Sequence, residues 1–212
     1  MSGHYNIGCG MSVGRSWINV DASPTLLFEK VPLIGWLHTK NRTRFPQQVL
    51  WGDITRLPLC AEGQADAVFC SHMLEHVPLE AMRQALKNIR VMLKKGGILR
   101  LIVPSLEARV HDYVTGGDAD AFLEATGLGE KCGSTRLLCR LRRALGNSGH
   151  RWMYDRRSMR RELEVAGFVA IRECGFGDSD DVLFAEVEDL GRFYRNGSRR
   201  PEDKEICLEC RN

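Results

Sequence analysis

Two segments of the chain carry histidines whose spacing suits acid–base chemistry. His72, Glu75 and His76 lie three and four residues apart, so a helical turn there would bring their side chains onto one face. His150 is a third candidate and comes from a distant segment. Because an imidazole has an ordinary pKa of about 6.5, it can take the proton of a hydroxyl or amine that reacts. The sequence therefore predicts His76, His150 and His72 as candidate catalytic bases.

The same residues allow two other interpretations. Glu75 and His76 could form a structural hydrogen-bonded pair at the start of a helix. Alternatively, His72, Glu75, His76 and His150 together supply three imidazoles and one carboxylate, which could bind a cation that orients two acceptor oxygens. The spacing alone does not separate these interpretations, so we predict no metal from the sequence.

A glycine-rich turn follows the first expected strand, in the segment Asn6-Ile-Gly8-Cys-Gly10. Glycines at such a turn let backbone N–H groups approach a ligand, because no Cβ interferes. Asp21 ends the next expected strand, where a carboxylate can accept hydrogen bonds from a ribose diol. Asp53 ends the third, where a carboxylate can accept from the exocyclic amine of adenine. The three strand ends together predict an adenosine pocket at the carboxyl edge of a sheet.

Two classes of protein must be weighed for such an adenosine pocket. A nicotinamide-dependent oxidoreductase usually has three closely spaced glycines and an acid about 20 residues later. Here only ten residues separate Gly10 from Asp21, which leaves no room for a full-length crossover helix. A binding module that has kept the cofactor fold but lost catalysis is the second alternative. The retention of all three strand-end signals argues against it.

Short apolar runs alternate with helical patterns along the first half of the chain, which predicts an α/β protein with a parallel sheet covered by helices. The expected helices cover residues 24–37, 78–95 and 156–166. The expected strands cover residues 4–7, 17–20, 49–51, 65–70, 98–103, 168–174 and 205–211.

Composition excludes several classes of protein. The chain has 212 residues, which favours one domain over residues 1–212. Its net charge of +3 does not by itself imply a nucleic-acid partner, so we expect none. No segment reaches the about 20 apolar residues that span a bilayer, and the N-terminus has no secretory pattern. We therefore expect a cytoplasmic protein without a membrane partner.

The eight cysteines are irregularly spaced, which favours free thiols, and Cys207 and Cys210 would face opposite sides of a strand.

These motifs, taken together, resemble those of class I S-adenosylmethionine-dependent methyltransferases, in a bacterial type 11-like subgroup. The resemblance covers roughly residues 4–104, and a segment at residues 150–155 adds to it. It implies a Rossmann-like, seven-stranded, mostly parallel sheet with an antiparallel last strand and helices on both faces. This chain departs from the family in its shortened first crossover. The segments that carry the resemblance are Tyr5-Asn-Ile-Gly-Cys-Gly10, Ile18-Asn-Val-Asp21, Gly52-Asp-Ile54, Ser71-His-Met-Leu-Glu-His-Val77 and Leu93-Lys-Lys-Gly-Gly97.

The resemblance also implies the cofactor, S-adenosyl-L-methionine, and the residues that contact it. Glycines of the first turn would approach the methionine part, an acid the ribose, and the third strand end the adenine. Residues after the fourth strand would border the sulfonium. The implied contacts are Gly8, Gly10, Asp21, Asp53, Ile54, Cys70, Ser71 and His72.

The acceptor of the methyl group is expected to be a small molecule or a saccharide, methylated on oxygen or nitrogen. Residues 106–150 and 175–203 are expected to be insertions that roof the acceptor pocket. Nine arginines lie between residues 136 and 161. They could form a solvated face that pairs with the acids of residues 173–190. Alternatively, they could bind an anionic acceptor, because arginine forks match phosphate and carboxylate groups. Arg151 and Tyr154, next to His150, are the candidate acceptor contacts. The sequence predicts no oligomeric state.

Overall fold

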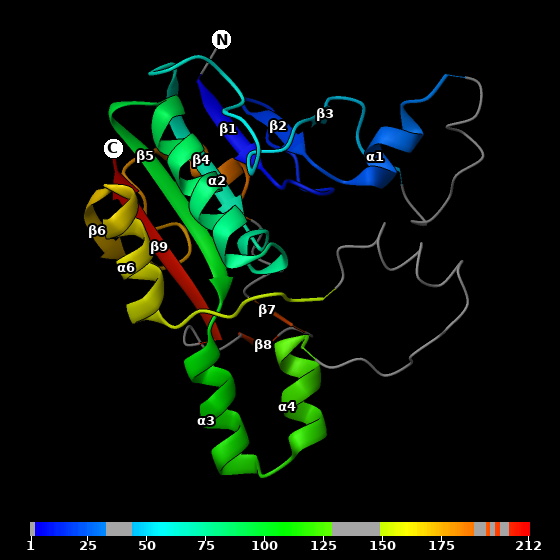
Figure 1. Cartoon of the computed structure of the whole chain (residues 1–212), viewed down its shortest axis with the longest axis vertical. Coiled ribbons are helices and arrows are strands. Elements are labelled where there is room, and N and C mark those ends of the chain that lie inside the picture. The colour runs from blue at the N-terminus through cyan, green and yellow to red at the C-terminus, as the bar shows by residue number, and fades with distance from the viewer. Residues whose placement is uncertain (1–2, 33–43, 129–148, 189–193, 196–197, 200–203) are drawn as a thin grey trace.

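The computed structural model describes residues 3–32, 44–128, 149–188, 194–195, 198–199 and 204–212. A single mixed sheet forms the centre of the molecule (Figure 1). Its strands are β1 (His4–Ile7), β2 (Ile18–Asp21), β3 (Leu50–Trp51), β4 (Ala65–Ser71), β5 (Leu93–Pro104), β6 (Val169–Glu173) and β9 (Glu205–Arg211).

The order of these strands is β3-β2-β1-β4-β5-β9-β6. Strands β3, β2, β1, β4 and β5 pair in parallel, whereas β9 runs antiparallel to both β5 and β6. The predicted α/β class is therefore confirmed, with a seven-stranded, mostly parallel sheet and an antiparallel last strand. Because the first strands are parallel, their carboxyl ends meet at one edge, where α/β proteins bind their ligands.

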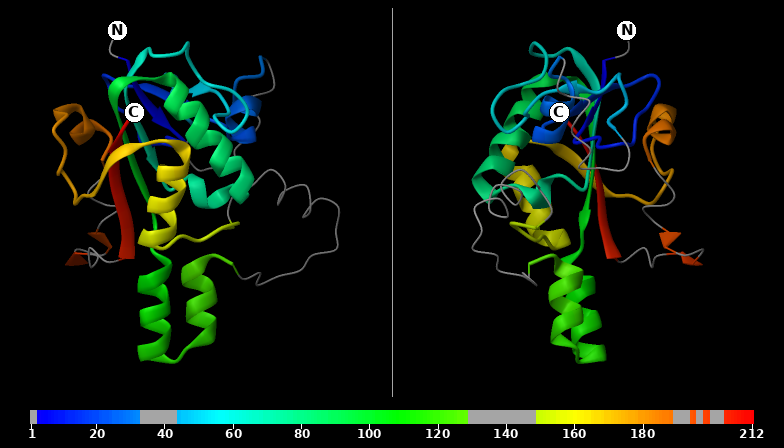
Figure 2. Two further views of the ribbon diagram at one scale, coloured as in Figure 1. Left: turned by 60° about the vertical axis from the view of Figure 1, so that its left-hand side comes forward. Right: turned by 90° about the vertical axis from the view of Figure 1, so that its right-hand side faces the viewer.

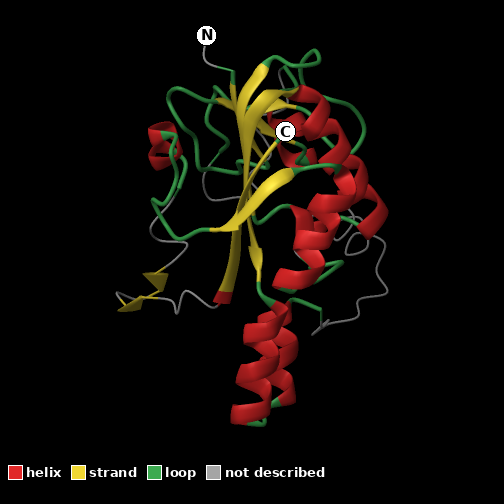
Figure 3. Cartoon of the chain, turned by 90° about the vertical axis from the view of Figure 1, so that its left-hand side faces the viewer, coloured by secondary structure: helices red, strands yellow, loops and turns green. Residues whose placement is uncertain are grey.

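Two α-helices cover one face of the sheet: α2 (Leu79–Met92) and α6 (Arg156–Ala166). Figures 2 and 3 show both on the same side. The apolar side chains of α2 recur at three- and four-residue steps, and Met82, Leu86 and Ile89 are all fully buried. The expected helix over residues 78–95 is thus confirmed, except that its last residues enter β5.

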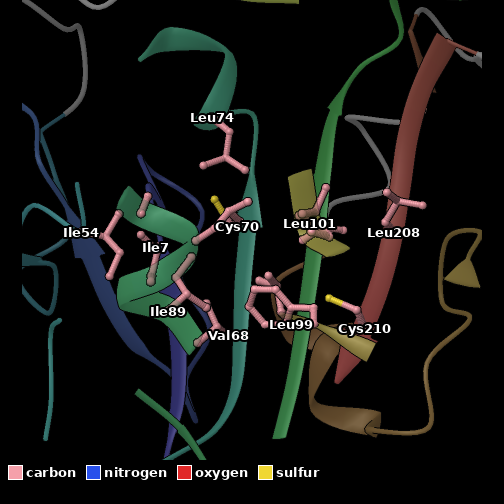
Figure 4. Close-up of a cluster of buried hydrophobic side chains, with 14 of the residues drawn as sticks. Ile7, Ile54, Val68, Cys70, Leu74, Ile89, Leu99, Leu101, Leu208 and Cys210 are labelled. Carbon is pink, nitrogen blue, oxygen red and sulfur yellow. The ribbon is translucent and has the colours of Figure 1, made fainter. Parts of the chain in front are cut away.

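The core under these helices is made by alternate side chains of the strands (Figure 4). In β4, Val68 and Cys70 face α2 and α6, whereas Ala67 and Phe69 face the opposite side. The strand is buried on both faces, as expected for a central parallel strand. Position along β4 therefore decides which face a side chain supports.

The opposite face of the sheet carries a smaller aromatic core. A short 3-10 helix, η3 (Val182–Glu186), covers it, as Figure 2 shows on the side away from α2 and α6. The rings of Trp17 and Phe184 lie 5.2 Å apart, and the rings of Trp17 and Phe69 lie 6.4 Å apart. The predicted short first crossover is confirmed, since residues 8–17 form turns and no helix.

Hydrogen bonds attach this crossover to the C-terminal segment. The Trp17 indole Nε1 donates to the Leu183 carbonyl at 3.0 Å. The Ser16 backbone N–H and hydroxyl both donate to the Glu186 carboxylate, at 2.8 Å each. The described residues near η3 therefore cover the sheet face that a crossover helix would otherwise protect.

The remaining elements lie near the carboxyl edge. Helix α1 (Pro24–Glu29) begins where expected but ends at Glu29, with Lys30 as its C-cap. Residues 33–37 of its expected range lie outside the described residues. Helices α3 (Leu106–Gly116) and α4 (Ala119–Thr126) form a hairpin that projects past the end of β5 (Figure 1).

A separate pair of antiparallel strands, two residues each, is formed by β7 (Tyr194–Arg195) and β8 (Ser198–Arg199). Within the described ranges, no helix is both long and apolar enough to cross a bilayer.

Candidate functional site

A cavity of about 610 Å³ opens at the carboxyl edge, beside the ends of β1 to β4. This volume is within the range of pockets that hold cofactor-sized ligands. Most of the predicted cofactor contacts line it, and so do two of the three predicted bases, His72 and His76. The predicted residues in its wall are Gly8, Gly10, Asp21, Asp53, Ile54, Ser71, His72 and His76.

The glycine turn has a backbone that other residues rarely adopt. Gly8 has φ +67° and Gly10 has φ +54°, both in the left-handed region. A Cβ on Gly8 would lie 2.7 Å from Cβ and Cγ of Met73, which is closer than real Cβ contacts. Gly8 is therefore required both by its backbone conformation and by the approach of Met73.

Two buried amides, which the sequence analysis did not identify, hold this turn. The Asn6 side chain donates to the Ser12 carbonyl at 2.8 Å and to the Asn19 side-chain oxygen at 3.1 Å. Asn19 also accepts from the Gly14 N–H and donates to the Gly14 and Trp17 carbonyls. Both amides are 2% exposed. A polar residue in the middle of each apolar strand was the available signal, because buried amides need partners.

The Asp21 carboxylate stands next to the glycine turn. Its Oδ2 accepts from the Gly10 backbone N–H at 2.9 Å, and its Oδ1 accepts from the Ser23 N–H at 2.7 Å. An ionised carboxylate has about four acceptor sites, so each oxygen retains capacity for a ligand hydroxyl. The two backbone bonds fix the carboxylate at the cavity wall.

Asp53 is fixed in a similar way at the end of β3. Its Oδ1 accepts from the Thr55 backbone N–H at 3.0 Å and from the Thr55 hydroxyl at 2.6 Å. The Arg56 guanidinium lies 3.1 Å from Oδ2. Ile54 is 2% exposed and belongs to the core, so its contribution to the cavity wall is mainly its backbone.

Cys70 and Ser71 have different positions although they are adjacent. Ser71 lines the cavity, whereas Cys70 is 1% exposed and packs in the core under α2. Burial raises the pKa of the Cys70 thiol well above its ordinary value, so the group is a neutral core residue. Alternation in β4 turns this side chain away from the edge, so the structure gives no support to a side-chain contact of Cys70 with the cofactor.

His72 follows β4 in a left-handed conformation with φ +52°, which is unusual for a residue with a side chain. Its backbone N–H donates to the Ile102 carbonyl at 2.9 Å and so continues the pairing of β4 with β5. The imidazole lies between two carboxylates: Nδ1 is 3.3 Å from Glu75 Oε1, and Nε2 is 3.6 Å from Glu205 Oε2. The sequence analysis missed Glu205, which lies far along the chain.

His76 and His150 come together, as the prediction of a common site requires. Their ring centroids lie 4.9 Å apart at an angle of 67°. The His76 Nδ1 contacts the Gly149 carbonyl at 3.2 Å, and the His150 Nδ1 contacts the Thr126 carbonyl at 2.7 Å. Burial lowers the pKa of His150 below its ordinary value, and the nearby Glu75 opposes this shift.

The two predicted acceptor contacts differ in accessibility. Arg151 is exposed, and its backbone N–H donates to the Glu75 carbonyl at 2.7 Å. Tyr154 is only 1% exposed and packs in the core, where burial raises the pKa of its phenol. A short β-bridge to Ser105 turns the Tyr154 segment inward. Tyr154 is therefore a packing residue in this structure, which gives no support to its predicted contact with the acceptor.

The fold and the cavity together define a class of protein. The antiparallel β9 lies between β5 and β6, whereas a dinucleotide-binding sheet has six strands in the order 3-2-1-4-5-6. This difference, with the short crossover, disfavours the nicotinamide-dependent alternative. A glycine turn and two strand-end carboxylates on one cavity define a Rossmann-like enzyme that binds an adenosine-containing cofactor.

Residues 6–101 match the family described as a methyltransferase domain. Over these residues the chain carries a methyltransferase domain, for which the methyl donor is S-adenosylmethionine. No curated protein sequence matches the chain.

Two solved structures are similar over nearly the whole chain. One is a SAM-dependent methyltransferase from Archaeoglobus fulgidus, with 15% identity, a TM-score of 0.48, and coverage of 99% of this chain and 85% of that one. The other is a SAM-dependent methyltransferase from Thermotoga maritima, with 16% identity, a TM-score of 0.48, and coverage of 98% and 81%. At this level of similarity neither structure bears on the acceptor.

Proposed function

We propose that the chain transfers a methyl group from S-adenosylmethionine to an oxygen or nitrogen of a small-molecule or saccharide acceptor. The observation that carries this proposal is that His76 and the two strand-end carboxylates line the same cavity. A group that can accept a proton therefore shares one pocket with the groups that suit the cofactor. Transfer to a hydroxyl or amine requires such a group, because the acceptor loses a proton as it is methylated.

The residues present fit the cofactor. Gly8 leaves open a place that a Cβ would fill, and Gly10, Asp21 and Asp53 present polar groups along the wall. We assign Asp21 to the ribose and Asp53 with the Ile54 backbone to the adenine, while Ser71 and His72 border the reacting end. The bound cofactor supplies an electrophilic methyl group on a positively charged sulfur.

The backbone contacts of the two histidines fix which ring nitrogen can accept the proton. A carbonyl oxygen can only accept a hydrogen bond, so the Nδ1 atoms of His76 and His150 carry the protons donated to Gly149 and Thr126. In the neutral imidazoles the lone pair is then on Nε2. His76 is the better base of the two, because it lines the cavity directly.

An anionic group on the acceptor is supported by Arg151. This arginine is exposed, directly follows His150, and makes no ion pair that the structure records within the described residues. Its guanidinium is therefore available for a phosphate or carboxylate.

A cytoplasmic location, a bacterial source and one domain over residues 1–212 stay predictions from the sequence.

Calorimetry with S-adenosylhomocysteine tests the cofactor assignments. We expect the native chain to bind it and not NAD. Asp21→Asn should weaken binding by about tenfold or more, since hydrogen bonds to a charged group contribute about 1.5–3 kcal/mol. Asp120→Asn, at an exposed position on α4, is the matched control and should bind normally. Binding of NAD in place of S-adenosylhomocysteine would overturn the proposal, and an unchanged affinity in Asp21→Asn would remove Asp21 from the site.

The acceptor class is tested by product analysis. The native chain with a labelled methyl donor is offered hydroxyl and amine acceptors, each in an anionic and a neutral form. Label in an O-methyl or N-methyl product supports the proposal, and label found only on carbon contradicts it.

A further inference from the structure

Glu75 is the most unusual ionisable group near the cavity. It belongs to the short 3-10 helix η2 (Leu74–His76), its side chain is 0% exposed, and neither carboxylate oxygen has a hydrogen-bond partner within the described residues. The nearest imidazole nitrogens lie 3.3 and 3.9 Å from Oε1, in His72 and His76, and neither contact has hydrogen-bond geometry. Because burying a carboxylate without a partner is costly, this position calls for an additional positive ligand.

Two imidazoles face the same point as this carboxylate. One nitrogen of His76, one nitrogen of His150 and one oxygen of Glu75 all lie within 4.8 Å of one another. The Nδ1 atoms of both rings are held by backbone carbonyls, so the Nε2 lone pairs are left for another partner. Histidines that bind metals are usually oriented in this manner, with the second ring nitrogen donating to a carbonyl or carboxylate.

The backbone holds the ligand segments in place without help from an ion. The Glu75 carbonyl accepts from the Arg151 N–H at 2.7 Å and from the Trp152 N–H at 3.2 Å, so the chain after His150 is tied to η2. The His150 N–H in turn donates to the Gly127 carbonyl at 3.2 Å, at the end of α4. Three segments far apart in the sequence are thus fixed around one point, which is the preorganisation that a binding site needs.

We propose that Glu75, His76 and His150 form a binding site for a divalent transition-metal ion of the Mn²⁺ or Zn²⁺ type. A ligand set of two imidazoles and one carboxylate suits these ions better than Mg²⁺ or Ca²⁺, which prefer oxygen ligands only. Three protein ligands leave coordination positions for water or for an acceptor oxygen. The cluster reaches the cavity through His76, so the ion would stand beside the acceptor.

The consequence for the reaction rests on the proposed function, whereas the binding of the ion does not. With the ion bound, the Nε2 lone pair of His76 would be coordinated, so the ion would take over the part of the base. It would polarise an acceptor hydroxyl and lower its pKa, so that the oxygen loses its proton to water more readily. An acceptor with two neighbouring oxygens, such as a sugar diol, could occupy two open positions. The site therefore favours a hydroxyl over an amine as the group that is methylated.

The test is a titration of the full chain with Mn²⁺ after treatment with a chelator, followed by electron paramagnetic resonance. Free Mn²⁺ has a strong signal that is lost on binding, and we expect one equivalent to bind. Pulsed measurements should detect imidazole nitrogen coupled to the bound ion. Glu75→Gln and His150→Ala should each weaken binding by at least about tenfold, as loss of even an indirect partner costs a metal site 10–100-fold. His111→Ala, which removes an exposed histidine on α3, is the control and should bind normally.

The possible failures are separable. The same samples are titrated with S-adenosylhomocysteine, and their melting temperatures report whether each variant folds. If S-adenosylhomocysteine binds but Mn²⁺ does not, or binds without nitrogen coupling, the metal site is overturned and the proposed function stands. Normal Mn²⁺ affinity in both Glu75→Gln and His150→Ala also overturns the site. If Mn²⁺ binds as expected and S-adenosylhomocysteine does not, the ion site stands and the proposed function fails.

Discussion

The cofactor side and the acceptor side of the cavity are built in different ways. On the cofactor side, the Asp21 carboxylate meets Gly10 across eleven positions of sequence. On the acceptor side, His76 meets Gly149 across 73 positions. Short-range partners make the first side recognisable from local motifs, whereas the second side exists only when distant segments pack together. The two sides should therefore respond differently to substitution.

The largest effect is expected on the acceptor side. His76→Ala removes the proposed base from the cavity wall, and loss of a general base typically lowers turnover by about 10²–10⁴-fold. The affinity for S-adenosylhomocysteine should change little, because the ribose and adenine contacts follow β2 and β3 and do not include His76. Turnover with a labelled donor and calorimetry measure the two quantities. Full turnover in both His76→Ala and His150→Ala would show that the base lies elsewhere.

The next effect is expected on the cofactor side, from two glycines with nearly equal backbone angles. Gly8 has φ +67° and Gly63 has φ +65°, but only Gly8 has a neighbour, Met73, within reach of a new Cβ. The left-handed backbone alone should make each change to alanine destabilise the fold by about 1–2 kcal/mol, and the close approach of Met73 should add to this in Gly8→Ala. Only Gly8→Ala should also weaken S-adenosylhomocysteine binding, by roughly tenfold, as expected for about one lost hydrogen bond. Equal affinities in the two variants would show that the turn accepts a Cβ.

A smaller effect is expected from Arg151 on the acceptor side. Arg151→Ala should raise the Michaelis constant for an anionic acceptor several-fold and leave cofactor affinity unchanged. In the native chain that constant should also rise with ionic strength, because exposed charges are screened over about 8 Å at physiological salt. Arg157→Ala, at an exposed position on α6, is the matched control. A Michaelis constant that is independent of salt would show that Arg151 does not bind an anionic group of the acceptor.

The smallest effect concerns the cap that follows the acceptor segment. The Asp155 side chain accepts from the Ser158 backbone N–H at the start of α6, and this bond lowers the pKa of the Asp155 carboxyl. Asp155→Ala should destabilise the fold by about 1 kcal/mol at pH 7. The ionised Asp155 carboxyl stabilises the fold at pH values above its unfolded pKa of about 3.9. This stabilisation is lost as the pH falls through the lower pKa that the carboxyl has in the folded chain.

Melting curves at several pH values measure this effect. Asp155→Asn keeps a capping oxygen without the charge, so it should retain most of the stability and show less dependence on acid. An Asp155→Ala variant as stable as the native chain would contradict the role of the cap.

The contrast between the two sides also explains which predictions from the sequence succeeded. Helix α2 and the buried strands were predictable, because apolar periodicity is a local property. The glycine turn, Asp21 and Asp53 were predictable for the same reason, since each follows a strand directly. The prediction that Cys70 borders the cofactor gets no support from its side chain, because strand alternation lets Ser71 reach the cavity and turns Cys70 into the core.

What the sequence could not provide was the direction of side chains fixed by long-range contacts. Tyr154 looked like an acceptor contact beside His150, but its bridge to Ser105 buries it. The buried state of Glu75 likewise depends on packing of the segment after His150 against η2. Such contacts have no signature in the local pattern of either segment.

The aromatic core on the second face of the sheet sets an order for folding. Ser16 in the crossover and Glu186 near the other end of the chain are 170 positions apart, yet they hydrogen-bond directly. Contacts across so many residues close slowly, because a long loop must lose its freedom first. During synthesis the crossover next to the glycine turn therefore lacks its final support until Glu186 has left the ribosome. A fragment that stops after β5 would contain every cofactor motif and still leave Trp17 uncovered.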